Sequence, residues 1–291
     1  MSVKLPFALK DGMLVEISSV ERGSECGCIC PACNKPLIAR KKRDYEHNYT
    51  DHFAHKANVD CPHALETAFH YAAKEILLKR RIMRVPSVIL QINKNSDDPF
   101  LIQGEQLISF DKVSLENSIG EVVPDVVVEI GNYRLMIEIY VTHRVDDIKK
   151  EKIRKLNLST IEIDLKAFRE TGTLADLEKE IIESTMNKQW IYNSTENDRK
   201  RKLKKHIKEK AIFKQWQGNC VQDCPVIGNK KNKMQASYKF HCSKCRFLYG
   251  VLKSRDETDL SIQCLGHANK EIDLIIRGIE RWEQRSFPLE F

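Results

Sequence analysis

Long apolar runs are missing from this sequence. None approaches the roughly 20 residues that a membrane-spanning helix needs, and the first residues lack the charged-then-apolar pattern of a signal peptide. The sequence also has no internal repeat of whole modules and no low-complexity tract. We therefore expect compact units in a cytoplasmic protein without a membrane partner.

Cysteine is missing from the whole interval between Cys61 and Cys220, although the chain has ten cysteines. Five of them lie between Cys26 and Cys61, and five lie between Cys220 and Cys264. In a reducing cytosol such cysteines are poor disulfide candidates and better metal ligands, above all in Cys-x-x-Cys pairs. The distribution predicts two metal-binding modules on either side of a cysteine-free core.

A strong charge of either sign is also missing. The 48 Lys and Arg residues against 41 Asp and Glu residues leave a net charge of +7, so a polyanionic partner is compatible with the composition but not required by it. A length of 291 residues with 42% hydrophobic residues is enough for two or three compact units, each with its own core.

The first cysteine cluster contains a zinc knuckle, Cys30-Pro31-Ala32-Cys33, whose tight turn points backbone amides at the two sulfurs. The other ligands are expected among His52, His55, Cys61 and His63. In an extended segment His52 and His55 face opposite ways, so only one of them is expected to bind the ion. The expected zinc ligands are Cys30, Cys33, His55 and Cys61, with His52 as the alternative. Cys26 and Cys28 are expected to be small buried apolar side chains.

The second cluster offers six ligands, which is more than one tetrahedral ion needs. Cys242-Ser243-Lys244-Cys245 is the expected knuckle, and Cys224 and Cys264 stand at nearly equal distances on either side of it. The expected ligands are Cys224, Cys242, Cys245 and Cys264, with Cys220 and His267 as alternatives. Both zinc ions would be structural, since protein ligands fill every position.

The secondary-structure pattern predicts a mixed α/β sheet with helices on both sides. A β-hairpin is expected over 7–17, with its turn at Asp11-Gly12, and a helix over 62–83 that Pro62 would open. Further expected strands cover 87–92, 106–113, 122–130, 134–142 and 160–165, and further helices cover 146–156 and 174–184. The expected domains are a β-rich zinc-finger module (1–62), the α/β core (63–187), a basic helical linker (188–215) and a zinc ribbon (216–291).

Within the expected linker, eight of the twelve residues over 199–210 are Lys or Arg. This run suits a solvated spacer and a surface that follows phosphates equally well.

Two acidic residues of the core form a candidate site. Asp125 begins one expected strand and Glu138 lies in the middle of the next, so the two carboxylates would bind one hard divalent cation, Mg²⁺ or Mn²⁺, with the carbonyl of Ile139 as a further ligand. Such an ion polarises a scissile phosphate and lowers the pKa of its bound water. Period-two alternation places Glu138 and Tyr140 on the face opposite Ile139. The alternative to a metal ligand is that Glu138 is a carboxylate at a sheet edge that pairs with a neighbouring lysine.

The first core helix presents a polar stripe, because Glu66, His70 and Lys74 are spaced four residues apart. Glu66 would bind metal or orient water, and His70 would hold a phosphate or transfer a proton. The alternative to these catalytic roles is that the three side chains form a solvated stripe of charges that pair with one another along the helix. His143, just after the strand of Glu138, suits either a contact with the same site or a helix cap.

The order of these elements resembles the PD-(D/E)XK nuclease core, with one departure. Tyr140 stands where that fold carries a lysine, and tyrosine cannot supply the positive charge that stabilises a developing phosphorane. Either a lysine reaches the site from elsewhere or catalysis is impaired. The candidates are Lys149, then Lys74, then Lys152.

The motifs together resemble the competence protein CoiA-like nucleases over residues 5–170, with gaps. They are Cys-Pro-x-Cys, His-Phe-Ala-His, the stripe of the first core helix, Pro-Asp-Val, Ile-Glu-Ile-Tyr-Val-Thr-His-Arg-Val-Asp with Lys149, and Ile-Glu-Ile-Asp-Leu at 161–165. The resemblance implies a zinc-finger protein with a restriction-endonuclease-like core, a Mg²⁺-dependent endodeoxyribonuclease of DNA uptake, recombination or anti-phage defence. It also implies a protein partner from the same system and Asp125, Glu138 and Lys149 as the catalytic set.

The sequence is also compatible with two other functions. One is a non-catalytic zinc-finger adaptor that binds nucleic acid, which Tyr140 favours, and the other is a protein-interaction subunit of a defence complex. The sequence leaves open whether single- or double-stranded DNA is cut, with what specificity, and whether the chain works as a monomer or a homo-oligomer.

Overall fold

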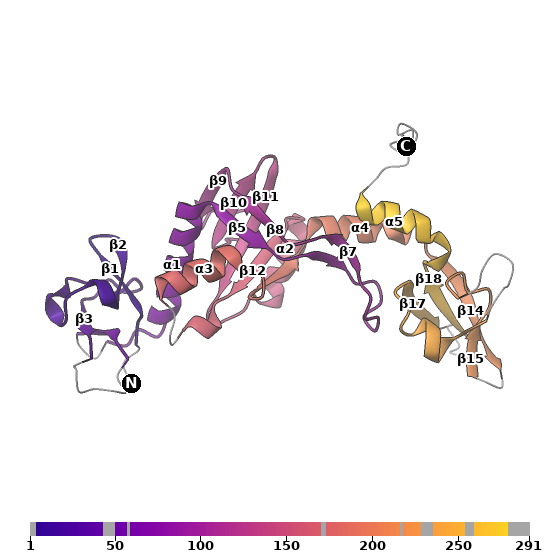
Figure 1. Ribbon diagram of the computed structural model, residues 1–291, viewed down its shortest axis with the longest axis horizontal. Coiled ribbons are helices and arrows are strands. Elements are labelled where there is room, and N and C mark those ends of the chain that lie inside the picture. The colour runs from indigo at the N-terminus through magenta and orange to yellow at the C-terminus, as the bar shows by residue number, and fades with distance from the viewer. Residues whose placement is uncertain are drawn as a thin grey trace, which may run out of the picture. The chain divides into compact units, whose positions relative to one another are not determined.

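The chain divides into two units, which we describe separately. The computed structural model describes residues 4–42, 50–56, 59–169, 173–215, 218–227, 235–253 and 259–278. The first unit consists of Met1–Pro86 and Glu105–Asn193, and the second consists of Ser87–Gly104 and Ser194–Phe291. A short piece from the middle of the chain therefore belongs with its C-terminal part (Figure 1).

The N-terminal part of the first unit is a small β module, as expected. Strands β1 (Phe7–Lys10) and β2 (Met13–Glu16) form the hairpin, and both residues of its turn have positive φ angles, 51° at Asp11 and 77° at Gly12. Strand β3 (Leu37–Arg40) pairs antiparallel with β4 (His52–His55). These strands surround a core of their own that includes Cys26, Cys28 and Cys30.

A five-stranded mixed sheet forms the centre of the first unit. Its order is β13-β12-β11-β10-β9. The strands are β9 (Lys112–Leu115), β10 (Val126–Ile130), β11 (Tyr133–Tyr140), β12 (Thr160–Asp164) and β13 (Lys188–Tyr192). β11 and β12 are parallel and the other neighbours are antiparallel. The predicted mixed α/β architecture is confirmed.

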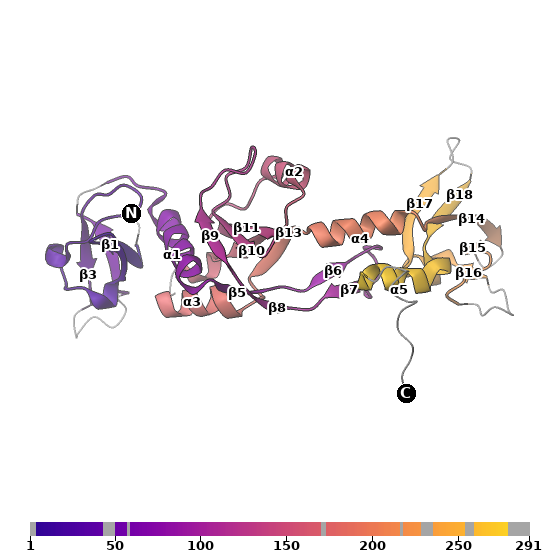
Figure 2. The same cartoon turned by 90° about the horizontal axis from the view of Figure 1, so that it is seen from above.

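Helices cover both faces of this sheet. They are α1 (Ala64–Arg80), α2 (Asp147–Leu156) and α3 (Leu174–Glu183). Ile137 and Ile139 of β11 pack into one core together with α1 and α3, whereas Met136 packs with Ile153 of α2 in another. Strand alternation therefore places Glu138 on the α2 face. Figure 1 shows α1 beside α3, and Figure 2 shows α2 on the opposite face.

Two predicted boundaries in the core were wrong. The first helix ends at Arg80, not 83, because Arg81 adopts a left-handed φ of 51° and Ile82–Val85 then forms strand β5. The helix also begins after Pro62, with His63 at its N-cap.

The predicted strand over 106–113 is two strands, β8 (Gln106–Ser109) and β9. The backbone changes partner between them: Phe110 donates to the carbonyl of Arg81, beside β5, and Asp111 donates to that of Glu129 on β10.

The predicted basic helical linker over 188–215 is helical only in its middle part. Its first residues form β13, which pairs with β12. Helix α4 then spans only Ser194–Lys204, and Lys208–Gln215 forms strand β14. Lys208 and Lys214 of β14 are exposed, and the partners of this strand, β15 and β18, come later in the chain, so its charge-rich sequence did not indicate a strand.

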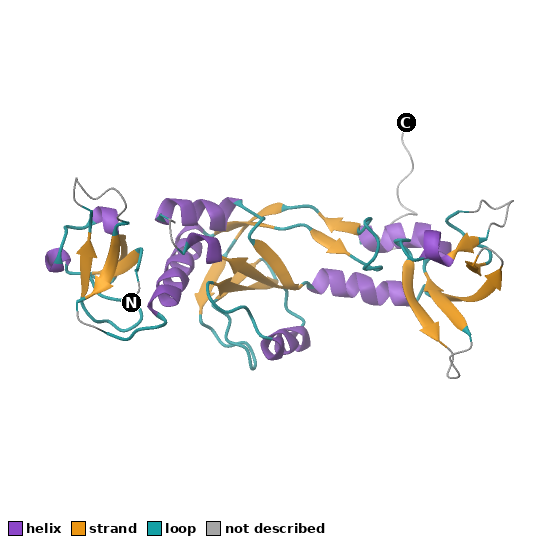
Figure 3. Cartoon of the chain, turned by 90° about the horizontal axis from the view of Figure 1, so that it is seen from below, coloured by secondary structure: helices purple, strands orange, loops and turns teal. Residues whose placement is uncertain are grey.

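The second unit contains an antiparallel five-stranded sheet in the order β16-β15-β14-β18-β17. Its other strands are β15 (Gly218–Val221), β16 (Ala236–Ser237), β17 (Leu248–Lys253) and β18 (Leu260–Cys264). The hairpin of β6 (Val88–Leu90) and β7 (Phe100–Gln103) packs with α4 and α5 (Asn269–Arg277) around a separate apolar core (Figure 3). In the described part of the chain, no helix is long and apolar enough to cross a membrane.

Candidate functional site

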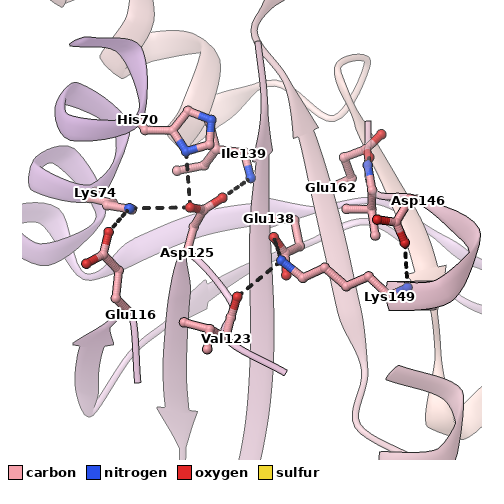
Figure 4. A network of polar contacts seen from close by, with 11 residues as sticks. His70, Lys74, Glu116, Val123, Asp125, Glu138, Ile139, Asp146, Lys149 and Glu162 are labelled. Atoms are coloured by element: carbon pink, nitrogen blue, oxygen red, sulfur yellow. Dashed lines mark hydrogen bonds and ion pairs between the residues drawn. The ribbon is translucent and has the colours of Figure 1, made fainter. Parts of the chain in front are cut away.

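Asp125 and Glu138 lie on neighbouring strands of the core sheet. The antiparallel register pairs Val126 with Ile137, so Asp125, one residue before β10, stands opposite Glu138. Just beyond that pair, the backbone N–H of Ile139 donates to Oδ2 of Asp125 over 2.8 Å. This bond fixes the Asp125 carboxylate beside Glu138 (Figure 4).

Helix α1 supplies two further partners of Asp125. The Nδ1 atom of His70 lies 3.1 Å and Nζ of Lys74 lies 3.3 Å from Oδ1 of Asp125. Lys74 also contacts Glu116 over 2.7 Å. Burial acts to raise the pKa of Asp125, but the bonds from His70 and Ile139 and the charges of His70 and Lys74 prevail and lower it to about 2. Asp125 is therefore a carboxylate at neutral pH.

Glu138 takes its partner from helix α2. The Nζ atom of Lys149 lies 2.8 Å from Oε2 of Glu138 and donates to the carbonyl of Val123 over 3.1 Å. The N-cap of α2 orients this lysine, because the Asp146 side chain accepts the backbone N–H of Lys149 over 2.6 Å. Lys152, one turn away, instead contacts Glu121 at 3.4 Å.

Glu138 is 4% exposed, and its Oε1 atom has no hydrogen-bond partner among the described residues. Burial raises the pKa of Glu138 to about 7, with a further upward contribution from the charge of Asp125 and an opposing one from Lys149. A buried carboxylate oxygen without a donor is an uncommon and costly arrangement, which a water or a bound cation would relieve.

No family model, curated protein or solved structure matches the chain. The function must therefore be inferred from the contacts of Asp125 and Glu138 and from the cysteine clusters.

The structure brings together five of the six residues predicted for catalysis: Asp125, Glu138, Lys149, His70 and Lys74. The described ion pair of Glu66 is a 3.9 Å contact with His63, and its role at the site stays a prediction. Ile139 enters the site through its N–H, and the role of its carbonyl as a metal ligand stays a prediction. His143 does not cap α2, because Asp146 does.

Three residues of this region were not assigned roles from the sequence. Glu116 reaches Lys74 from a loop, which no local pattern indicates. Glu162 is 1% exposed, lies in register with Glu138 on β12, and accepts the N–H of Val145 over 3.2 Å. The Ile-Glu-Ile pattern that β11 and β12 share was the available signal. Arg144 contacts Glu162 at 3.9 Å.

The N-terminal ligand set is the one expected from the sequence. Ligand atoms of Cys30, Cys33, His55 and Cys61 all lie within 4.8 Å of one another, so the four side chains form a cluster that could hold a zinc-type metal. His55 Nε2 is 3.2 Å from the Cys33 sulfur. His52, the alternative ligand, lies outside the cluster, with its Nδ1 atom 2.8 Å from the carbonyl oxygen of Thr50.

Backbone amides surround the thiols of this cluster. Burial acts to raise the pKa of Cys33, but the backbone N–H of Lys35 and the thiols of Cys30 and Cys61 lower it. Burial raises the pKa of Cys30, and the backbone N–H groups of Cys33 and Ala32 directed at its sulfur oppose that rise. Amides directed at sulfur stabilise thiolates, the form that binds zinc.

Cys26 and Cys28 are buried side chains of the N-terminal core, as expected. Their thiols lie 3.5 Å from backbone carbonyl oxygens, those of Leu37 and Cys26 respectively.

Four of the five C-terminal cysteines line one pocket of about 380 Å³ in the second unit. They are Cys224, Cys242, Cys245 and Cys264. Burial is the largest of the causes that raise the pKa of Cys242 to about 12, and the charges of Cys224, Cys245, Cys264 and Cys220 act in the same direction. Among the described residues, however, only the N-terminal set has all its ligand atoms within 4.8 Å.

The second knuckle has the same amide arrangement as the first. Backbone N–H groups of Phe247 and Leu248 are directed at Cys245, and Gly266 donates to the Cys264 sulfur over 3.3 Å. A Cβ atom at Gly266 would lie 2.8 Å from a methyl group of Val226, so only glycine fits there without movement. The alternative ligands Cys220 and His267 do not line the pocket.

Proposed function

We propose that this protein is a metal-dependent nuclease that hydrolyses phosphodiester bonds of DNA. The observation that supports it most is the group of Asp125 and Glu138 on adjacent strands, with Lys149 Nζ 2.8 Å from Glu138. The element order helix, Asp strand, Glu strand, helix, strand is that of the PD-(D/E)XK core, which we infer for residues 63–187.

The residues fit a hard divalent cation, Mg²⁺ or Mn²⁺. Asp125 and Glu138 would hold it, since such ions take carboxylate oxygens and Oε1 of Glu138 has no hydrogen-bond partner among the described residues. A cation would also offset the raised pKa of Glu138, because a nearby positive charge favours the ionised carboxylate. When bound, the ion would supply polarisation of the phosphate and activation of a water.

The chain's own residues then have separate roles. Lys149 has three N–H donors, of which Glu138 and Val123 take two, so one is left for a phosphate oxygen. Its charge would stabilise the developing phosphorane, the role that Tyr140 cannot fill. His70 and Lys74 would hold Asp125 in place and ionised.

Two structural zinc ions complete the proposal. The first takes Cys30, Cys33, His55 and Cys61. The second takes the four cysteines that line the C-terminal pocket, Cys224, Cys242, Cys245 and Cys264. Both sets would fold their modules around the metal.

The biological setting comes from the resemblance to CoiA-like nucleases alone. We propose DNA as the substrate, a cytoplasmic location, and work with a protein partner in DNA uptake, recombination or phage defence. The net charge of +7 is compatible with a nucleic-acid substrate.

A second candidate function is a zinc-finger adaptor that binds nucleic acid without cutting it. Tyr140 in the lysine position is the observation that favours it. An adaptor would bind DNA in a salt-sensitive way and yield no cleavage product with any divalent ion.

Plasmid cleavage separates the two functions. We expect the native chain to cut plasmid DNA with Mg²⁺ or Mn²⁺ and not with EDTA, and Glu138→Gln and Asp125→Asn to lose this activity. Glu151→Gln, at an exposed position of α2, is the matched control and should cut normally. Cleavage that survives Glu138→Gln would reject the proposed site.

A further inference from the structure

Arg144 lies just beyond β11, where neighbouring side chains hold its guanidinium in place. Its guanidinium carbon lies 4.9 Å from the centre of the Tyr140 ring, and one of its nitrogens lies 3.2 Å from Oδ2 of Asp164. Asp164 is itself fixed, because its other oxygen accepts the backbone N–H of Lys166 over 2.9 Å. An aromatic face and a fixed carboxylate together orient the guanidinium.

This arginine is close to the proposed active site. Tyr140 follows Glu138 by two residues and therefore points to the same face of the sheet. Arg144 also approaches Glu162 to 3.9 Å, and Glu162 is the partner of Glu138 in the register of β11 and β12. The guanidinium is thus one strand away from the carboxylate that would hold the catalytic cation.

The side chain remains available for a ligand. It is 53% exposed, and a guanidinium has five N–H donors in a planar fork, so contacts with Asp164, Glu162 and Tyr140 still leave donors for a ligand. Arginine binds phosphate through paired N–H groups of this kind.

A groove of about 640 Å³ continues from Arg144 over the first unit. Lys166 lies exposed on its wall, and Lys188, which is 6% exposed, lies beneath it. Asp164 and Glu180 are the acidic residues that line it, against the three cations. Arg144 and Lys166, the exposed cations of the groove, therefore offer two positive charges to a phosphate backbone.

We propose that Arg144, supported by the ring of Tyr140, binds a backbone phosphate of DNA adjacent to the scissile one, and that the strand continues along this groove. The inference rests on the proposed function for the position of the scissile phosphate. It gives Tyr140 a role: the residue that departs from the lysine pattern supports a cation for the substrate.

The test is DNA binding by the full chain as a function of salt. A fluorescein-labelled duplex and its single strand are titrated in Ca²⁺, without Mg²⁺, and binding is followed by fluorescence anisotropy over a series of KCl concentrations. Arg144→Ala should weaken binding about tenfold and reduce the slope of log K against log salt by about one, which is the loss of one phosphate contact. Tyr140→Leu should act in the same direction.

Arg154→Ala is the matched control. Arg154 is also 53% exposed and pairs with Glu151 at 2.9 Å, but it lies on α2 and does not line the groove. It should leave the salt slope unchanged. Arg144→Lys should keep the slope and lose part of the affinity, because an ammonium keeps the charge but not the fork. This variant keeps the test valid if the alanine variant folds poorly.

The binding and cleavage results together test the phosphate contact and the nuclease proposal separately. Equal effects of Arg144→Ala and Arg154→Ala would overturn the inference, and so would salt-insensitive binding by the native chain. Cleavage by the native chain together with such a result would leave the nuclease proposal in place. A smaller slope for Arg144→Ala in a chain that never cleaves would support the phosphate contact and reject the nuclease.

Discussion

Lys149 and Glu138 form an ion pair of 2.8 Å between helix α2 and the centre of strand β11. The lysine position of the PD-(D/E)XK pattern, two residues after Glu138, holds tyrosine, but a lysine from the next element in the chain reaches the same carboxylate. The pair is the basis of the catalytic role that we propose for Lys149.

Lys149→Ala is expected to lower kcat of Mg²⁺-dependent cleavage roughly 100-fold with a small change in KM, because the charge acts mainly in the transition state. Steady-state cleavage of labelled DNA measures both constants. Lys152→Ala is the control on the same helix, since Lys152 contacts Glu121 instead, and it should retain activity. Full activity of the Lys149→Ala variant would exclude a catalytic role for Lys149.

The raised pKa of Glu138 predicts a pH-dependent stability without added divalent ion. The folded-state pKa of about 7 exceeds the ordinary 4.5, so the folded state holds an extra proton between these values, and the free energy of unfolding should fall as pH rises through this window. The contribution is roughly 3 kcal/mol. Urea unfolding of the native chain and of Glu138→Gln at pH 5 and pH 8 measures it.

The Glu138→Gln chain should lack this decline, and Mg²⁺ should restore stability to the native chain above pH 7. The same pH slope in both chains would show that Glu138 does not titrate as described.

The zinc content of variants should show which of His52 and His55 is a ligand in the first module. His55→Ala should lose one zinc ion per chain, because His55 Nε2 belongs to the cluster with three thiols. His52→Ala should keep it, since His52 lies outside that cluster although it is just as buried. Elemental analysis of the purified variants gives the ratio. Zinc loss from the His52 variant alone would exchange the two roles.

The second zinc site is tested by Cys264→Ser and Cys220→Ser. Cys264 lines the pocket of the second unit and receives the N–H of Gly266, whereas Cys220 is buried outside the pocket. We expect the first variant to lose one zinc ion and the second to keep two. Gly266→Ala should also weaken zinc binding, because a Cβ atom would press on Val226 and lie 3.5 Å from the Cys264 sulfur. Two zinc ions in all three variants would contradict this site.

Local periodicity was sufficient to predict much of the core. The alternation of Ile137, Glu138 and Ile139 defines which face of β11 is polar, and the four-residue spacing of His70 and Lys74 directs both to Asp125. The knuckles are also local, since their turns direct amides at the sulfurs within a few residues.

Pairings between distant segments could not be predicted in this way. The break between β8 and β9 depends on Arg81 and Glu129, which are far from Phe110 in sequence. Asn93 donates to the carbonyls of Ser243 and Cys245, which places a hairpin from the middle of the chain in the second unit. The contacts of Glu116 and Arg144 likewise come from loops, whose course follows from tertiary packing and not from a period.

The most direct test of the proposed function is a crystal structure with Mn²⁺, located by its anomalous scattering. We predict one manganese ion bonded to an oxygen of Asp125 and an oxygen of Glu138, each at about 2.1 Å, with Lys149 Nζ beside it. Manganese bound to only one of the two carboxylates, or found only at the cysteine clusters, would contradict a shared hydrolytic metal site.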